Sequence, residues 1–135
     1  MTRINVIPVY ELSDQHLLAE YRELPRVIKQ KLKLDDSVDR YHLGCGHMKW
    51  ARKHWKFTLN RYYELFSEML YRGFYPKYTP AELEQYAVEL NEVNPDANYI
   101  VDQIDINLNR ERIISKYKLH PEHYTWTNRT KPNWL

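Results

Sequence analysis

Hydrophobic residues recur along most of this chain at the spacing of an α-helix. Between residues 13 and about 33, four apolar side chains stand at i, i+4, i+7 and i+11 and share one helical face: Leu17, Tyr21, Leu24 and Ile28. Ser13 or Asp14 is suited to cap the start of this helix. Pro25 cannot donate a hydrogen bond to the Tyr21 carbonyl, so we expect a bend within the helix.

Three more helical segments follow. One is predicted over residues 55–72, with Gly73 as its stop and four inward positions: Leu59, Tyr62, Phe66 and Met69. A short acidic helix is predicted from residue 79 to about 90, and a third main helix over about 105–117. No two segments are suited to pair as strands. The predicted fold class is therefore all-α, with three main helices, a short acidic helix and long ordered loops.

Length and composition favour a compact single domain over residues 1–135. No run of about 18 apolar residues and no leader-like start is present, so we expect a protein that is neither membrane-spanning nor secreted. Cys45 is the only cysteine, which excludes an internal disulfide and fits the cytoplasm. Cysteine and histidine form no cluster at zinc-ligand spacing, so no metal is predicted.

The formal net charge of +2 conceals an asymmetry, because residues 79–109 hold seven acidic residues and no Lys or Arg. Such a split is typical of a protein with one face for a polyanion, although randomly charged solvated helices explain it equally well. Four aromatic residues near the basic clusters favour phosphate contact combined with base stacking: Trp50, Trp55, Tyr124 and Trp126. Trp55 also suits a core position.

The polar face of the first helix holds candidate chemistry. Steps of 100° bring five polar side chains together opposite the apolar stripe: Gln15, His16, Arg22, Glu23 and Arg26. In one interpretation this face is a ladder of surface ion pairs, which stabilises little. In the other, substrate phosphates occupy the guanidinium groups and leave the Glu23 carboxylate available for proton transfer.

The start of the chain offers a second reactive group. Removal of Met1 would leave Thr2 with a free α-amine. The pKa of an α-amine is about 7.7–8.0, against about 10.4 for lysine, so much more of it is an uncharged nucleophile at neutral pH. Such an amine can form an imine with a latent aldehyde. An ordinary processed terminus is the alternative interpretation.

Seven segments together carry a family resemblance: residues 1–5 (MTRIN), 14–27 (DQHLLAEYRELPRV), 43–47 (LGCGH), 60–62 (NRY), 72–74 (RGF), 109–113 (NRERI) and 124–127 (YTWT). On these segments the chain resembles the T-even bacteriophage endonuclease V family. Its members are pyrimidine dimer DNA glycosylases with associated apurinic/apyrimidinic (AP) lyase activity. The long, non-repetitive run at 14–27 makes the resemblance specific. The acidic stretch 79–105 matches least clearly.

The resemblance implies both a fold and a reaction. The N-terminal segment is expected to lie between the first two helices of an all-α fold, near Glu23. The Thr2 α-amine would attack C1′ of the damaged nucleotide, expel the base and form an imine. Glu23 would take the proton lost in β-elimination, which cuts the strand. Neither a metal nor another cofactor is expected.

The resemblance also assigns the binding residues. Arg3, Arg22 and Arg26 match positions that grip phosphates around the lesion, and Gln15 and His16 match positions near the lesion itself. Further DNA-contacting positions lie on the third helix and in the tail: Arg112, Lys116, Tyr124 and Trp126. The expected partner is double-stranded DNA with ultraviolet damage or abasic sites, bound by a monomer. The partner adenine is expected to be extruded into a protein pocket.

Two alternatives remain open at this point. The chain is more basic at 48–55 than its relatives, so it could act on another modified base through the same imine chemistry. It could also be a helical DNA-binding protein without catalysis. His47, beside a turn of two glycines, is interpreted as a structural loop residue.

Overall fold

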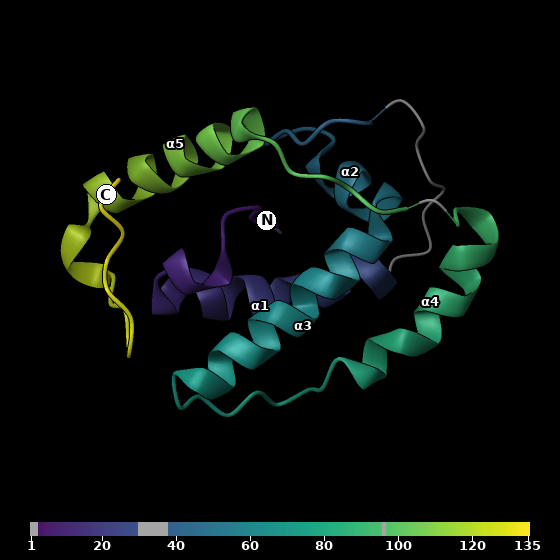
Figure 1. Ribbon diagram of the computed structural model, residues 1–135, viewed down its shortest axis with the longest axis horizontal. Helices are drawn as coiled ribbons and strands as arrows, with labels where there is room; N and C mark the ends of the chain where they lie inside the picture. Colours follow the sequence, from purple (N-terminus) through teal and green to yellow (C-terminus); the bar gives the residue numbers. More distant parts are fainter. Residues whose placement is uncertain (1–2, 30–37, 96) are drawn as a thin grey trace.

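The computed structural model describes residues 3–29, 38–95 and 97–135. These residues form two short 3₁₀ turns, five α-helices and no strand: η1 Val9–Glu11, α1 Asp14–Lys29, α2 His47–Lys53, α3 Trp55–Tyr71, α4 Ala81–Val93, α5 Gln103–Leu119 and η2 Pro121–His123. In Figure 1, α3 crosses α1, while α5 lies on the other side of the N-terminal segment. The all-α class is therefore confirmed for the described residues. None of their helices is both long and apolar enough to cross a membrane.

The first helix agrees with the apolar stripe of the sequence. All four predicted core residues, Leu17, Tyr21, Leu24 and Ile28, are buried. The Ser13 hydroxyl accepts a hydrogen bond from the His16 amide at 3.1 Å, as an N-cap does. Pro25 lies inside the helix, which is described as far as Lys29. Residues 30–33, which were expected to extend it, lie outside the described residues.

The later helices differ from their predicted bounds by a few residues. Helix α3 ends at Tyr71, and Gly73 follows with a φ of +84°, a left-handed conformation that favours glycine. Helix α5 begins at Gln103, because Asp102 and Asp105 form a reciprocal capping box there. Among the inward positions of α3, Tyr62 and Met69 are buried, whereas Leu59 and Phe66 are half-buried.

The pattern did not predict α2, and the exposed role suggested for Trp50 is wrong. Trp50 is 0% exposed and packs edge-on against Tyr41 and Tyr99. Trp55 is also buried, and its indole donates to the Asn94 carbonyl at 2.9 Å, which fits its core interpretation. Neither tryptophan can stack on a base. A helix of only seven residues presents too few turns for a periodic signal to stand out.

The N-terminal segment is fixed by polar contacts from several helices. The Ile4 amide donates to His47 Nε2 at 2.8 Å, and the Val6 and Ile7 amides donate to the Asn109 side chain at 2.7 and 3.1 Å. Arg61 of α3 donates to the Ile7 carbonyl at 2.5 Å. Ile4 and Ile7 are themselves 0% exposed. Their burial and these bonds fix the backbone from Ile4 onward.

The C-terminal tail is bonded to the start of α1. The Asp14 carboxylate accepts hydrogen bonds from the side chains of Thr125 and Thr127, each at 2.7 Å, and from Arg72 at 2.9 Å. Burial alone would raise the pKa of Asp14, but these bonds outweigh it and lower that pKa. Glu68 joins the same cluster through Arg72. The tail is therefore held on the start of α1 by hydrogen bonds.

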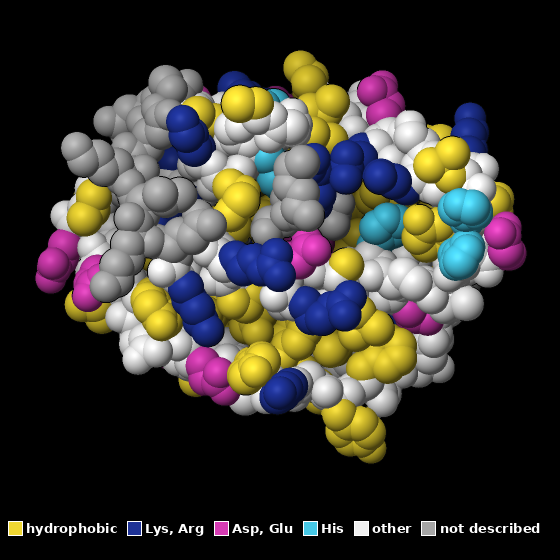
Figure 2. Space-filling view, turned by 180° about the vertical axis from the view of Figure 1, so that it is seen from behind, with side chains coloured by type: hydrophobic (Ala, Val, Ile, Leu, Met, Phe, Trp, Pro, Cys, Tyr) yellow, Lys and Arg dark blue, Asp and Glu magenta, His cyan; other side chains and the backbone are white. Residues whose placement is uncertain are grey.

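Charge is unevenly distributed over the surface. Figure 2 shows a face on which Lys and Arg side chains form a band across the middle, with most acidic side chains nearer the rim. The glutamates of α4 are exposed: Glu82, Glu84, Glu89 and Glu92. The acidic stretch therefore contributes solvated surface, as the charge pattern predicted.

Candidate functional site

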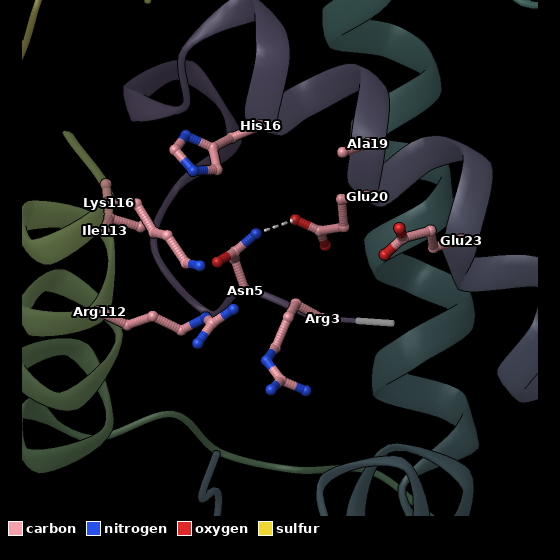
Figure 3. Close-up of a pocket in the computed structure, with 9 residues that line it drawn as sticks. All are labelled: Arg3, Asn5, His16, Ala19, Glu20, Glu23, Arg112, Ile113 and Lys116. Atoms are coloured by element: carbon pink, nitrogen blue, oxygen red, sulfur yellow. Dashed lines mark hydrogen bonds between the residues drawn. The ribbon is translucent and has the colours of Figure 1, made fainter. Parts of the chain in front are cut away.

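A pocket of about 210 Å³ lies between α1, the N-terminal segment and α5, and we call it the α1–α5 pocket (Figure 3). Nine residues line it: Arg3, Asn5, His16, Ala19, Glu20, Glu23, Arg112, Ile113 and Lys116. Five of them were candidate site residues in the sequence. Segments more than a hundred residues apart thus supply one set of polar groups. Thr2, the candidate nucleophile, lies outside the described residues.

The inner side of this pocket is built around a buried ion pair. Glu20 and Arg61 are 1% and 3% exposed, and the Arg61 Nε donates to Glu20 Oε2 at 2.8 Å. Asn5 donates to the other Glu20 oxygen at 2.8 Å and accepts a bond of 2.8 Å from Asn109. Every charge on this side has a partner. Such a network holds the N-terminal segment against α1 and α5.

The side of the pocket that faces the solvent, which we call the open side, carries groups of both charges. Glu23 is half-buried and makes no hydrogen bond or ion pair with any residue that the structure describes. Arg3, Arg112 and Lys116 point toward the same space in Figure 3. Burial, together with the neighbouring charge of Arg3, lowers the pKa of Arg112. The positive charge gathered here is suited to attract a phosphate-bearing ligand.

His16 is the neutral member of the pocket. Burial, reinforced by the charges of Arg112 and Lys116, lowers its pKa to about 4. Its Nδ1 lies 2.9 Å from the Ser13 hydroxyl, and its ring stacks on Tyr124 with centroids 5.0 Å apart and planes 4° apart. At neutral pH, His16 can therefore offer a hydrogen bond without adding charge.

The tail residues belong to the same end of the pocket. Tyr124 is half-buried between His16 and Tyr117. Trp126 is half-buried too, and its indole donates to the Glu11 carbonyl at 3.0 Å. Gln15 is exposed and exchanges two hydrogen bonds with Thr125. These contacts place Tyr124 beside the pocket and show that Trp126 helps to dock the tail.

Arg22 and Arg26 point elsewhere on α1. They line a second pocket of about 690 Å³, the Tyr21–Tyr62 pocket, together with nine other residues: Tyr21, Pro25, Lys29, Tyr62, Lys77, Tyr78, Thr79, Glu82 and Leu83. The rings of Tyr21 and Tyr62 stack with centroids 5.2 Å apart. The Tyr21 hydroxyl donates to the Tyr78 carbonyl at 2.6 Å. An aromatic pocket with cations around it suits a planar ring attached to a phosphate.

Sequence reasoning missed the residues that support the site. Glu20 and Asn109 were not singled out, although both are buried beside the candidate residues. The presence of Glu20 within the apolar stripe of α1 was an available signal, because a buried carboxylate needs a partner. His47 is structural, as interpreted, but it is the first residue of α2 and does not lie in a loop. Burial lowers its pKa to about 4.

The fold and the two pockets define a class of protein. A helical fold that gathers cations, a neutral histidine and a carboxylate without a partner among the described residues is suited to bind a nucleic acid and move protons on it. The class indicated is an all-α enzyme that acts on nucleic acid.

The chain belongs to the pyrimidine dimer DNA glycosylase family, whose family model it matches over residues 1–91. This confirms the resemblance to the T-even bacteriophage endonuclease V family. Family membership implies DNA repair on ultraviolet-damaged DNA, with dimer-specific glycosylase and AP lyase activities. It also argues against a DNA-binding protein without catalysis.

Proposed function

We propose that the reaction takes place in the α1–α5 pocket, with the Thr2 α-amine as nucleophile and Glu23 as the group that moves protons. Arg3 lines this pocket, and Thr2 directly precedes Arg3 in the sequence. The proposal therefore assigns the Thr2 amine to the same pocket. The observation that carries the proposal is the available Glu23 carboxylate on the open side.

The amine nitrogen forms a bond to C1′ while the bond from C1′ to the damaged base breaks, and the base leaves with the electron pair and takes up the proton that the amine loses. The C1′–O4′ bond then breaks, O4′ takes a proton from water, and a protonated imine joins Thr2 to C1′. This imine makes the C2′ protons acidic. Glu23 accepts one of them, and the 3′ phosphate leaves as the C2′–C3′ double bond forms. The products are a nicked strand and a transient covalent enzyme–sugar adduct.

The cations supply binding rather than chemistry. Arg3, Arg112 and Lys116 would neutralise phosphates at the lesion, and Arg22 and Arg26 would neutralise phosphates beside the Tyr21–Tyr62 pocket. Gln15, His16, Tyr124 and Trp126 would contact the lesion at the other end. A single chain supplies every group of the proposed site, so we propose that a monomer acts on the duplex.

The Tyr21–Tyr62 pocket would receive the extruded partner adenine that the family resemblance implies. Its volume of about 690 Å³ falls within the usual range of small-ligand pockets, ~300–1,000 Å³. Both pockets are built from α1, so one helix would address both strands at the lesion. An abasic nucleotide opposite the dimer should therefore bind less tightly than adenine does.

Borohydride trapping tests the proposed nucleophile. The protein without Met1 is incubated with abasic duplex DNA and borohydride, and the covalent adduct is mapped by peptide mass. Residue 2 should carry the sugar, and blocking the terminus with one extra residue should abolish trapping. Lys116 is the matched control, because its amine lines the same pocket. An adduct on Lys116, or one that survives the blocked terminus, would contradict the proposal.

A panel of duplexes with defined lesions tests the substrate. We expect base release at cyclobutane dimers and nicking at abasic sites, but no release of single oxidised or alkylated bases. Efficient release of such a base would favour the alternative that the imine chemistry serves another lesion.

A further inference from the structure

Three potential metal ligands meet in the turn that follows α5. His120, Glu122 and His123 each offer one ligand atom, and these atoms lie within 4.8 Å of one another. The His120 Nδ1 is 3.7 Å from a Glu122 carboxylate oxygen, and the two imidazole rings are 5.0 Å apart. All three side chains are exposed. The structure thus corrects the sequence expectation that no ligand cluster is present.

The backbone holds these ligands at their spacing. The His123 amide donates to the His120 carbonyl at 3.0 Å, and the His120 amide donates to the Tyr117 carbonyl at 3.2 Å. Pro121 restricts the backbone between the two histidines. Two imidazoles and one carboxylate are a common zinc ligand set, with metal–ligand distances of about 2.0–2.2 Å. All three side chains are exposed, so each can change rotamer when a metal binds.

We propose that the turn at 120–123 is a binding site for a zinc-like divalent cation. The end of α5 supports it, because the C-terminal end of a helix carries partial negative charge. Water would complete the coordination sphere, since only three protein ligands meet there. None of the three residues lines the α1–α5 pocket, so the ion takes no part in the imine chemistry. It would instead stabilise the turn before Tyr124, which stacks on His16.

Isothermal titration calorimetry with zinc ions tests this site. The protein carries no polyhistidine tag and is first freed of metal by a chelator. We expect one equivalent to bind with micromolar affinity. His120→Ala and His123→Ala should each weaken binding by about tenfold or more, and Glu122→Gln should weaken it less. His42→Ala and Cys45→Ser serve as matched controls, because they remove a half-buried imidazole and an exposed thiol beside another turn. Both controls should bind as the unaltered protein does.

Nuclear magnetic resonance of the imidazole nitrogens identifies the ligands directly. Of the six histidines, only His120 and His123 should change when zinc is added. Failure of the unaltered protein to bind zinc would overturn the proposal. Unchanged binding by the His120→Ala/His123→Ala double variant would overturn it as well. These outcomes do not depend on nicking activity, so they leave the proposed reaction untouched.

Discussion

Two carboxylates on α1 line the same pocket and have opposite surroundings. Glu20, on the inner side, is 1% exposed and is bonded to both Arg61 and Asn5. Glu23, one turn later on the open side, is half-buried and has no such partner among the described residues. A fully paired carboxylate has no oxygen left for a substrate proton. In the proposed reaction, one helix therefore carries both a supporting carboxylate, Glu20, and a chemical one, Glu23.

Charged groups have different energetic costs on the inner side and on the open side of the pocket. A buried ion pair compensates its desolvation only when its geometry is good, and the loss of one partner leaves an unpaired buried charge. The open side has the opposite property. Arg3, Arg112 and Lys116 are like charges held near one another, and an incoming phosphate relieves their repulsion. The inner network is therefore formed on folding, whereas in the proposed reaction the substrate phosphates neutralise the charges of the open side.

Removal of the Glu23 charge should have the largest effect. In Glu23→Gln the amide cannot accept the C2′ proton, so nicking of abasic DNA should fall by about 10²–10⁴-fold. DNA affinity and the free energy of unfolding should change little, because the side chain is not part of an internal ion pair. Single-turnover nicking and fluorescence anisotropy measure the two quantities. Glu111→Gln, at an exposed position of α5, is the matched control, and equal nicking by both variants would refute the role of Glu23.

Removal of the Arg61 charge should mainly affect stability. Arg61→Met leaves Glu20 charged and buried, so the free energy of unfolding should fall by about 3–5 kcal/mol. Urea denaturation measures it. The double variant Glu20→Met/Arg61→Met removes both charges and should recover much of the loss. If Arg61→Met is as stable as the unaltered protein, the stability of the inner side does not depend on the ion pair between Glu20 and Arg61.

His47 should make the stability of the inner side depend on pH. Its pKa is lowered from 6.5 to about 4, chiefly by burial. The unfolded chain therefore binds a proton more readily than the folded one in this range. The stability contributed by neutral His47 is complete above about pH 6.5 and is lost as the pH falls toward 4, in total of order 3 kcal/mol.

The variant His47→Gln isolates this effect. Between pH 6.5 and 4.5, its free energy of unfolding should fall less steeply than that of the unaltered protein, by up to about 1.4 kcal/mol per pH unit. Urea titrations at several pH values provide the comparison. His16 is present in both proteins, so its own titration cancels. Parallel curves for the two proteins would show that His47 does not lose its bond to Ile4 by protonation.

Loss of one cation on the open side should have the smallest effect. Arg112→Ala should weaken binding to undamaged duplexes about equally for all sequences, and it should reduce the slope of log K against log salt by about 1. Anisotropy titrations at several salt concentrations measure that slope. Lys118→Ala is the control, because Lys118 is exposed on the same helix outside the pocket. The same loss in both variants would mean that the open side is not a distinct phosphate site.

The sequence predicted those features that repeat along a helix. The apolar stripe of α1 is complete, and the polar face opposite it holds Gln15, Arg22 and Arg26 at exposed positions. The family resemblance brought in residues that no periodicity connects, such as Arg3 and Lys116. These two line one pocket because the N-terminal segment and α5 pack together, which is a long-range property.

Other features could not be predicted because they depend on tertiary contacts. Trp50 stands among basic residues in the sequence, yet it is buried by Tyr41 and Tyr99. Asn109 serves two backbone amides more than a hundred residues earlier. The cluster at 120–123 depends on a 3₁₀ turn, which gives no periodic pattern. In each case, the partner lies outside the window over which a pattern is recognised.

The bonds between Asp14 and the tail bear on how short a working form of this protein can be. The family match covers residues 1–91, but Thr125 and Thr127 bond to the first residue of α1, and Arg112 and Lys116 complete its pocket. A version cut after residue 91 would retain the matched segment and lose two of the five proposed phosphate contacts, Arg112 and Lys116. Minimal variants for biotechnological use should therefore keep the chain at least through Thr127.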